Sequence, residues 1–198
     1  MPSGDTRQDQ KRRGPAPSLQ VEQILTAALR LLDRDGAKAF NVRSLAAELG
    51  AAPMTLYNYF PTKVALVTAT VDSVLAQTDL PSASAEQWDE ELRRYARQAW
   101  ETQAAHPWIP TLLAEERLVD RPMVKASRRA LLDLFSAAGA DEETSRQAVA
   151  AFFSFMIGSF MQVRLTPGGK VPARAHTLFQ AGINILIDGL SVRFSRRA

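Results

Sequence analysis

The sequence predicts an all-α fold of about nine helices. Apolar residues recur at spacings of three and four along most of the chain, and no stretch shows the alternation of apolar and polar residues that is typical of a β-strand. Helix-capping residues, glycines and prolines divide this pattern into segments of helix length. Hydrophobic residues make up 46% of the 198 residues, a content that supports a hydrophobic core and excludes a generally disordered chain.

The chain is expected to begin with a polar segment that precedes the first helix. Residues 1–17 contain proline and glycine among polar residues and should be disordered on their own. Their basic cluster at 11–13 is either a solvated tail or an arm that lies against DNA phosphates or enters the minor groove. The apolar stripe that follows predicts a helix over 19–34, which Gly36 should end.

The next two predicted helices are short and are separated by a glycine. Asn41 can cap a helix that starts at Val42, and Gly50 can adopt the left-handed conformation that ends it. Pro53 begins the second of these helices, and Pro61 ends it because proline disfavours the helical conformation in the residue before it. Two short helices joined by such a turn are typical of a helix-turn-helix, whose second helix fits the major groove of DNA.

Spaced residues across these three helices and the start of the next one form one pattern. It comprises Ile24, Leu25, Ala27, Ala28, Leu29, Gly36, Leu45, Ala46, Leu49, Gly50, Thr55, Leu56, Tyr57, Tyr59, Phe60, Lys63 and Leu66. This pattern resembles the amino-terminal domain of TetR-type transcriptional regulators. The resemblance implies a ligand-responsive regulator, most often a repressor, that binds a palindromic double-stranded DNA operator as a homodimer and is released by a small hydrophobic molecule. It leaves two alternatives open, an activator and a protein-interaction module without small-molecule response.

The exposed face of the second short helix offers groups that can reach the edges of DNA bases. Thr55 can donate or accept a hydrogen bond there, Asn58 can pair with adenine, and Pro53 or Met54 can pack on a thymine methyl group. Lys63 begins the following helix, where its charge opposes the helix dipole but lies beside free N–H groups that favour a phosphate. The resemblance adds four contacts to phosphates or an outer base: Arg43, Ser44, Tyr57 and Tyr59.

Two residues depart from the usual pattern of the family. Ala52 stands where relatives mostly carry a serine, so the second short helix should lack a side-chain cap, a loss of about 1 kcal/mol. Pro53 at the first helical position should offset part of this loss. Val64 replaces the acidic residue that usually follows the lysine, and it is expected to face inward with Val67.

Six further helices are predicted after the helix-turn-helix. They cover residues 63–78, 84–105, 109–118, 121–138, 142–165 and 172–193. Within them, residues 147–163 carry no charge, but this run is shorter than the about 20 apolar residues of a membrane span and contains polar side chains, so a buried or interface helix is expected. Residues 18–66 are expected to form the DNA-binding domain, with the fourth helix linking it to about residue 80. Residues 81–198 are expected to form a helical bundle for ligand sensing and dimerisation.

The bundle should hold an effector pocket and a subunit interface, as the resemblance implies. Apolar and polar residues at 100–160 are candidates for the pocket lining: Trp100, Gln103, Trp108, Leu112, Leu113, Met123, Leu131, Phe152, Phe155, Met156 and Phe160. Small and apolar residues of the last two helices are candidates for a four-helix dimer interface: Ala150, Ser154, Gly158, Ala181, Gly182, Ile185 and Gly189.

Several other classes of function find no support in the sequence. The two histidines are too few for a metal site, and no cysteine is present, so no metal or cofactor is expected. Neither Glu-x-x-His nor Gly-x-Ser-x-Gly occurs, and an enzyme is therefore not expected. The amino terminus has no apolar segment of a signal peptide, and a cytoplasmic protein is expected. The net charge of +3 is compatible with a DNA partner but does not by itself indicate one.

Overall fold

The described part of the chain is all-helical, as predicted. The computed structural model describes residues 19–83, 86–110, 112, 121–167 and 169–195. Eight helices lie within these residues: α1 (Val21–Ala39), α2 (Val42–Glu48), α3 (Pro53–Tyr59), α4 (Lys63–Leu75), α5 (Trp88–Ala105), α7 (Pro122–Ala137), α8 (Glu142–Met161) and α9 (Ala173–Ser195). The basic segment at 1–17 and most of the helix predicted at 109–118 lie outside the described residues.

The helix-turn-helix forms as the local signals predicted. The Asn41 side chain caps α2 by accepting a hydrogen bond of 2.8 Å from the backbone N–H of Ser44. Gly50, at a φ of +62°, lies in the turn before α3. Ala52 occupies the cap position of α3 and makes no side-chain hydrogen bond, and Pro53 follows at the first helical position. The start of α3 is therefore favoured by the proline at its first position and not by a side-chain cap.

Several helix ends differ from the predictions. Gly36 breaks the first helix as predicted, since its φ of +74° and ψ of 163° are not helical, and α1 then continues beyond this kink to Ala39. α5 begins only after Gln87, four residues later than expected, and α8 ends at Met161 rather than near residue 165. Each prediction relied on local capping or hydropathy, whereas the observed ends depend on where the chain must turn to pack.

One side chain of α4 points away from its predicted side. Val64 was expected to face inward, but it is 52% exposed, whereas Val67 is buried as predicted. Val64 lies in the first turn of α4, and the buried positions Leu66, Val67, Thr70 and Val71 define a packed face that excludes it. An apolar side chain is thus left on the surface next to Lys63.

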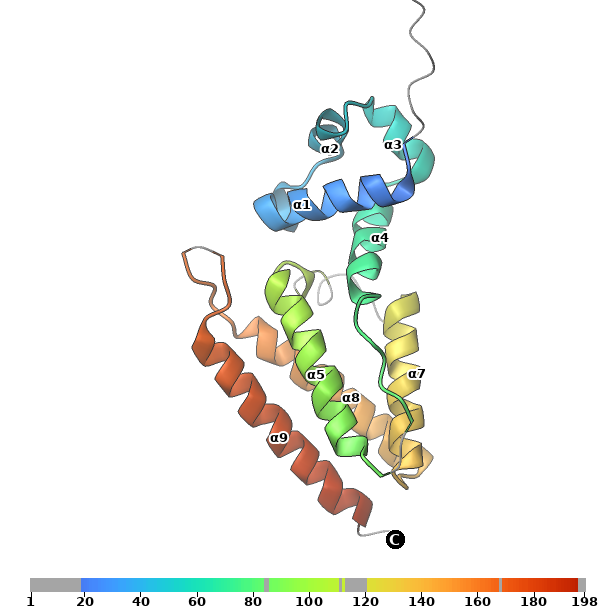
Figure 1. The fold of residues 1–198 in the computed structure, drawn as a ribbon, viewed down its shortest axis with the longest axis vertical. Helices are drawn as coiled ribbons and strands as arrows, with labels where there is room; N and C mark the ends of the chain where they lie inside the picture. The colour runs from blue at the N-terminus through green and yellow to red at the C-terminus, as the bar shows by residue number, and fades with distance from the viewer. Residues whose placement is uncertain (1–18, 84–85, 111, 113–120, 168, 196–198) are drawn as a thin grey trace, which may run out of the picture.

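The core is divided into two clusters of buried side chains. The first, called the amino-terminal cluster, consists of Ile24, Ala27, Ala28, Leu31, Leu32, Phe40, Val42, Leu45, Ala46, Leu56, Leu66, Val67, Val71, Val74, Trp108 and Ile109. The second, called the bundle cluster, contains buried residues of α5, α7, α8 and α9, among them Trp100, Leu131, Phe152 and Phe179. Figure 1 shows α1, α2 and α3 gathered at one end of the molecule around α4, with the bundle at the other end. A division into two domains near residue 80 stays a prediction.

Two polar links join these parts of the molecule. The Trp108 indole N–H donates to Oδ1 of Asp33 on α1 at 2.8 Å, and Nδ1 of His106 lies 2.7 Å from the same oxygen. At the start of α7, Nη2 of Arg121 donates to the Thr68 hydroxyl on α4 at 2.6 Å, and its Nη1 lies 3.9 Å from Oδ2 of Asp72. Burial raises the pKa of Asp72, while the charge of Arg121 acts in the opposite direction. The chain after α5 and the start of α7 are therefore both attached to the α1–α4 region.

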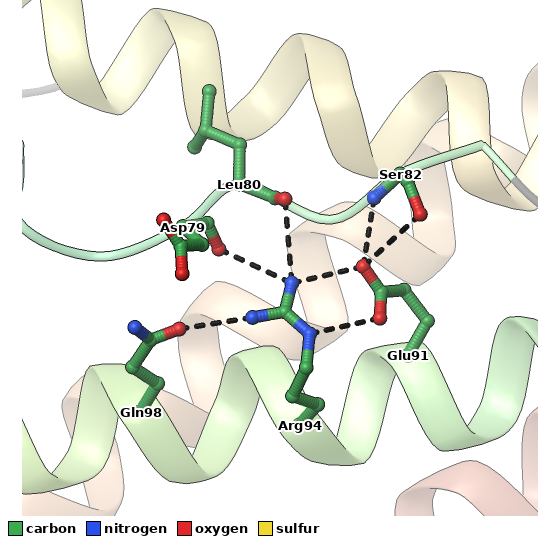
Figure 2. A network of polar contacts seen from close by, with 6 residues as sticks. All are labelled: Asp79, Leu80, Ser82, Glu91, Arg94 and Gln98. Carbon is green, nitrogen blue, oxygen red and sulfur yellow. Dashed lines mark hydrogen bonds and ion pairs between the residues drawn. The ribbon is translucent and has the colours of Figure 1, made fainter.

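A third network holds the segment between α4 and α5 against the bundle (Figure 2). Nη2 of Arg94 donates to the backbone oxygens of Asp79 and Leu80 at 3.3 Å, and to Oε1 of Glu91 at 2.8 Å. Glu91 also accepts the backbone N–H of Ser82 at 2.8 Å. These hydrogen bonds, that from Arg94 above all, lower the pKa of Glu91 from 4.5 to about 2. The non-helical connection thereby keeps a fixed path along α5.

Candidate functional site

The exposed side of α3 carries the side chains expected to reach DNA bases. Leu56 is buried in the amino-terminal cluster and anchors the helix. On the other side, Pro53 and Asn58 are exposed, and Met54 is exposed over 71% of its surface. Thr55 is half-buried. The helix thus presents a short row of hydrogen-bonding and apolar groups toward solvent, as reading the edges of bases requires.

The two tyrosines of α3 differ in their hydrogen bonding. Both are exposed, but the Tyr59 hydroxyl donates to the backbone oxygen of Leu19 at 2.6 Å, a contact that the sequence did not predict. This hydrogen bond ties the end of α3 to the residue that precedes α1. The Tyr57 hydroxyl has no hydrogen bond among the described residues and is available to donate to a phosphate oxygen.

Two cations accompany α3 on the surface. Arg43 lies in the first turn of α2 and Lys63 at the first position of α4, and both are exposed without an ion-pair partner in the described part of the chain. Nζ of Lys63 lies 5.7 Å from the centroid of the Phe40 ring, a cation–π distance, and the residue remains exposed to solvent. Ser44 is also exposed, and because its N–H is bonded to Asn41, its hydroxyl remains for a further contact.

A mainly apolar cavity of about 120 Å³ lies between α4, α5, α7 and α8. It is lined by Leu75, Thr78, Tyr95, Ala99, Gln103, Val124, Ser127, Arg128, Phe152, Phe153, Met156 and Ile157. Burial raises the pKa of Tyr95, an effect that its hydrogen bond with Ser127 partly opposes. The Arg128 guanidinium lies 5.5 Å from the centroid of the Phe153 ring. The cavity therefore combines apolar walls with a few polar anchors, as small-molecule sites do.

The predicted pocket residues are spread over several places. Gln103, Phe152 and Met156 line this cavity, while Trp100 and Phe155 line a separate hollow beside α9. The remaining described candidates lie elsewhere: Leu131 and Phe160 in the bundle cluster, Trp108 and Leu112 at the amino-terminal cluster, and Met123 half-buried on α7. Leu113 lies outside the described residues.

Sequence reasoning missed the contributions of α4 and α7 to the cavity. Leu75 is the last residue of α4, Thr78 follows that helix, and Val124, Ser127 and Arg128 come from α7. The i, i+3 and i+4 spacing of the three α7 residues was a detectable signal that they share a face. That this face meets Tyr95 and Phe152 was not detectable, because it depends on how the helices cross.

The residues expected at a subunit interface lie on the outer sides of α8 and α9. Ala150, Ser154, Ala181, Ile185 and Gly189 are exposed, and Gly158 and Gly182 are half-buried. A Cβ atom at Gly182 would lie 2.6 Å from the Phe155 ring, so this glycine also serves the packing of α9 on α8 within the chain.

The predicted interface residue Ile185 belongs to an apolar stripe on α9 whose other two members, Leu178 and Val192, were not predicted. Leu178, Ile185 and Val192 recur every seven residues and are 60%, 72% and 53% exposed. The outer side of α9 is therefore apolar over most of its length.

Other kinds of site are not supported by the described residues. No group of three or more histidine or acidic side chains that could hold a metal ion occurs among them. None of the helices that the structure describes is long and apolar enough to cross a membrane. The uncharged run at 147–163 instead forms most of α8, which buries Phe152, Met156 and Phe160 in the bundle.

The sequence is similar to a known protein family and to two curated proteins. Residues 24–70 match the model of the family described as bacterial regulatory proteins, tetR family. The HTH-type transcriptional repressor DrrR1 of Streptomyces coeruleorubidus is 26% identical over 148 residues, which cover 74% of this chain and 54% of that protein. An HTH-type transcriptional regulator of Saccharopolyspora erythraea is 29% identical over 150 residues, covering 76% of this chain and 63% of that protein. The matched part thus spans between about half and two thirds of these relatives.

Solved structures extend the similarity in fold over nearly the whole chain. ActR from Streptomyces coelicolor without ligand superposes with a TM-score of 0.77 at 20% identity, over 93% of this chain and all of that one. ActR in complex with (S)-DNPA gives 0.72 at 20% identity, over 92% of this chain and all of that one. BioQ with its double-stranded DNA operator gives 0.72 at 22% identity, over 88% of this chain and 99% of that one.

The family match covers the elements that place the exposed side of α3. It begins at Ile24 in α1 and continues to Thr70 in α4, so it includes both helices of the helix-turn-helix and the turn between them. Both curated relatives are named as transcriptional regulators, which agrees with the prediction that the chain is not an enzyme. Residues 24–70 of the chain therefore match the tetR family of bacterial regulatory proteins, and the fold of the remaining helices is similar to that of solved tetR-type proteins.

Proposed function

We propose that this protein is a homodimeric DNA-binding repressor of transcription in the cytoplasm, released from a palindromic operator by a small apolar molecule. The observation that carries the proposal is the exposed side of α3, flanked by the free cations Arg43 and Lys63. Similar proteins support the three parts of this proposal. DrrR1 is named a repressor, the structure of BioQ has been solved with its DNA operator, and that of ActR has been solved with a small molecule.

In the proposed complex, α3 lies in the major groove. Thr55 and Asn58 hydrogen-bond to base edges, and Met54 and Pro53 pack on thymine methyl groups. Phosphate contacts from the flanking elements fix the position of the helix on the duplex. Those contacts come from Arg43, Ser44, Tyr57 and Lys63, and Tyr59 can add one only by giving up its hydrogen bond to the Leu19 oxygen.

A second subunit doubles the length of DNA that is read. One α3 helix of seven residues can contact only a few base pairs, so a symmetric pair on half-sites about 34 Å apart, or a multiple of this distance, is required for specificity. The exposed apolar stripe of α9, together with the small residues of α8, is the surface proposed to join the subunits.

The effector is proposed to bind in the cavity between α4, α5, α7 and α8. Leu75 at its wall is the last residue of the helix whose first turn carries Lys63, and Thr78 at its wall follows that helix. Arg121 ties the start of α7 to Thr68 in the middle of that helix. A ligand that separates α7 from α4 would therefore tilt α4 and change the distance between the two α3 helices of the dimer.

A binding-site selection with the purified protein tests the proposal. A palindromic site is expected, with an affinity that falls steeply as the salt concentration rises, because phosphate contacts release counterions. Binding without sequence preference would contradict the regulatory proposal. The effector part of the proposal is tested with a ligand that shifts the NMR resonances of Gln103 and Phe152 on titration. Such a ligand should lower operator affinity, and an unchanged affinity would refute the proposed coupling.

A further inference from the structure

A second hollow, separate from the proposed effector cavity, lies beside the start of α9. Its volume is about 540 Å³, and none of its lining residues lines the other cavity. It is bounded by α5, the last turns of α8, the connection after α8 and the first turns of α9, at the end of the bundle from which that connection protrudes in Figure 1. Its size lies within the range of about 300–1,000 Å³ that is usual for small-molecule sites.

The inner wall of the hollow is aromatic and fixed. The Trp100 and Phe179 rings stack at 4.1 Å between centroids with an angle of 15°, and Phe155 stacks on Phe179 at 5.6 Å and 28°. The Trp100 indole N–H donates to Nδ1 of His176 at 2.9 Å, so the only polar group of that ring is already satisfied. The wall therefore favours a flat, apolar body that makes no hydrogen bonds of its own.

The rim of the hollow is cationic. Arg164 follows α8, and Arg174 lies in the first turn of α9, where free backbone N–H groups add partial positive charge. Both arginines are exposed, and neither has a carboxylate partner among the described residues, in contrast to Arg93, Arg94 and Arg146. No aspartate or glutamate lines the hollow.

We propose that this hollow binds a small aromatic carboxylate. The carboxylate lies between Arg164 and Arg174, where guanidinium groups can bind it through paired, charge-assisted hydrogen bonds. The ring lies against Phe155 and Phe179. An uncharged ligand would gain the apolar contact and at most a neutral hydrogen bond with Ser159 or Gln162, and an aliphatic anion would gain only the ion pair, so the combination of wall and rim selects for both properties. This site does not depend on the proposed DNA contacts, but it shares Leu178 with the apolar stripe of the proposed subunit interface.

The test compares two probes of the same shape in the full-length protein. 2-Naphthoate carries the charge, and 2-naphthalenemethanol does not. Each is titrated while the backbone and indole N–H resonances are followed by NMR, and affinities are measured by calorimetry. 2-Naphthoate is expected to shift the indole resonance of Trp100 and to bind about tenfold or more tightly than the alcohol, as two charge-assisted contacts imply.

A double variant, Arg164→Gln with Arg174→Gln, tests whether these two arginines bind the carboxylate of 2-naphthoate. It should weaken 2-naphthoate about tenfold and leave the alcohol unchanged, and because both side chains are exposed, it should fold as the parent does. The control is Arg146→Gln at the other end of α8, which should change neither affinity. Equal binding of both probes to the unaltered protein, undiminished binding of 2-naphthoate to the double variant, or shifts confined to Tyr95 and Gln103 in the other cavity would each overturn the proposal.

Discussion

The Tyr57 hydroxyl reaches solvent without an internal partner, whereas the Tyr59 hydroxyl holds the backbone of Leu19. Tyr57→Phe should therefore lower operator affinity about fivefold to twentyfold without changing the melting temperature, because it removes one hydrogen bond to a charged phosphate. Tyr59→Phe should also lower the free energy of unfolding, by about 1 kcal/mol, because an internal hydrogen bond is lost. Fluorescence anisotropy on the selected operator and thermal unfolding would measure the two effects.

Asn58→Ala serves as a comparison for these variants. It should change which base pair is preferred at one position of the operator, whereas loss of a phosphate contact should weaken binding to all sequences. If Tyr57→Phe bound every sequence as tightly as the unaltered protein, the hydroxyl would make no phosphate contact and α3 would have to be oriented differently on DNA.

Glu91 supplies a prediction for pH. Its pKa of about 2 in the folded protein lies below its ordinary 4.5, so the stabilisation it provides is complete above pH 4.5 and is lost as the pH falls toward 2. Glu91→Gln should lower the free energy of unfolding at pH 7 by about 1 kcal/mol, a modest value because Arg94 is partly exposed. Urea unfolding at a series of pH values should show the difference between the two proteins shrinking below pH 4.5. Glu90→Gln, next to it on the exposed side of α5, serves as the control, and a difference that stayed constant down to pH 2 would contradict the prediction.

At the scale of the helices, the ends that depend on a single local residue were predictable. The Asn41 side chain accepts a backbone N–H of the helix that follows, as predicted, and Thr62 and Asp141 do the same at the starts of α4 and α8. The beginning of α5 was not predictable, because the preceding segment is held by Arg94 and Glu91 through contacts that become visible only in three dimensions.

The uncapped start of α3 can be improved. Ala52 is exposed and extended at the cap position, so Ala52→Ser should let a hydroxyl accept from the backbone of α3 and raise the free energy of unfolding by about 0.5–1 kcal/mol. Urea unfolding would measure the gain. Ala47→Ser, in an exposed position inside α2, should give no gain, and an equal gain from both would show that capping is not the cause.

At the scale of the whole molecule, the surface of α9 is expected to set the oligomeric state. Ile185→Glu places a charge in the middle of the apolar stripe and should convert a dimer into a monomer in sedimentation experiments. Operator affinity should then fall more than tenfold, because the two half-sites are no longer bound by one particle. Val64→Glu, at an exposed apolar residue on α4, should leave the dimer intact. A parent protein that already sediments as a monomer would refute the proposed interface.

The sequence was more informative about α3 than about the cavities. The residues expected to contact DNA fall within 21 positions of each other, so the spacing along two short helices decides their direction. The cavity between α4, α5, α7 and α8 is built from segments up to 82 residues apart, Leu75 to Ile157, and only the crossing of the helices brings them together. Trp100 and Phe155 were predicted to line the effector pocket, but in the structure they line the hollow beside α9 and not the cavity between α4, α5, α7 and α8.

Trp108 has a consequence for any attempt to isolate the DNA-reading part of the molecule. Its indole and the side chain of Ile109 are part of the amino-terminal cluster that α1 and α4 help to form, although both residues follow α5 in the chain. A fragment cut after α4 would expose the apolar residues of this cluster to water and would remove the indole N–H that donates to the Asp33 carboxylate. Such a fragment should be prone to aggregation, and a peptide that carries the missing tryptophan and isoleucine should restore its solubility when added in trans.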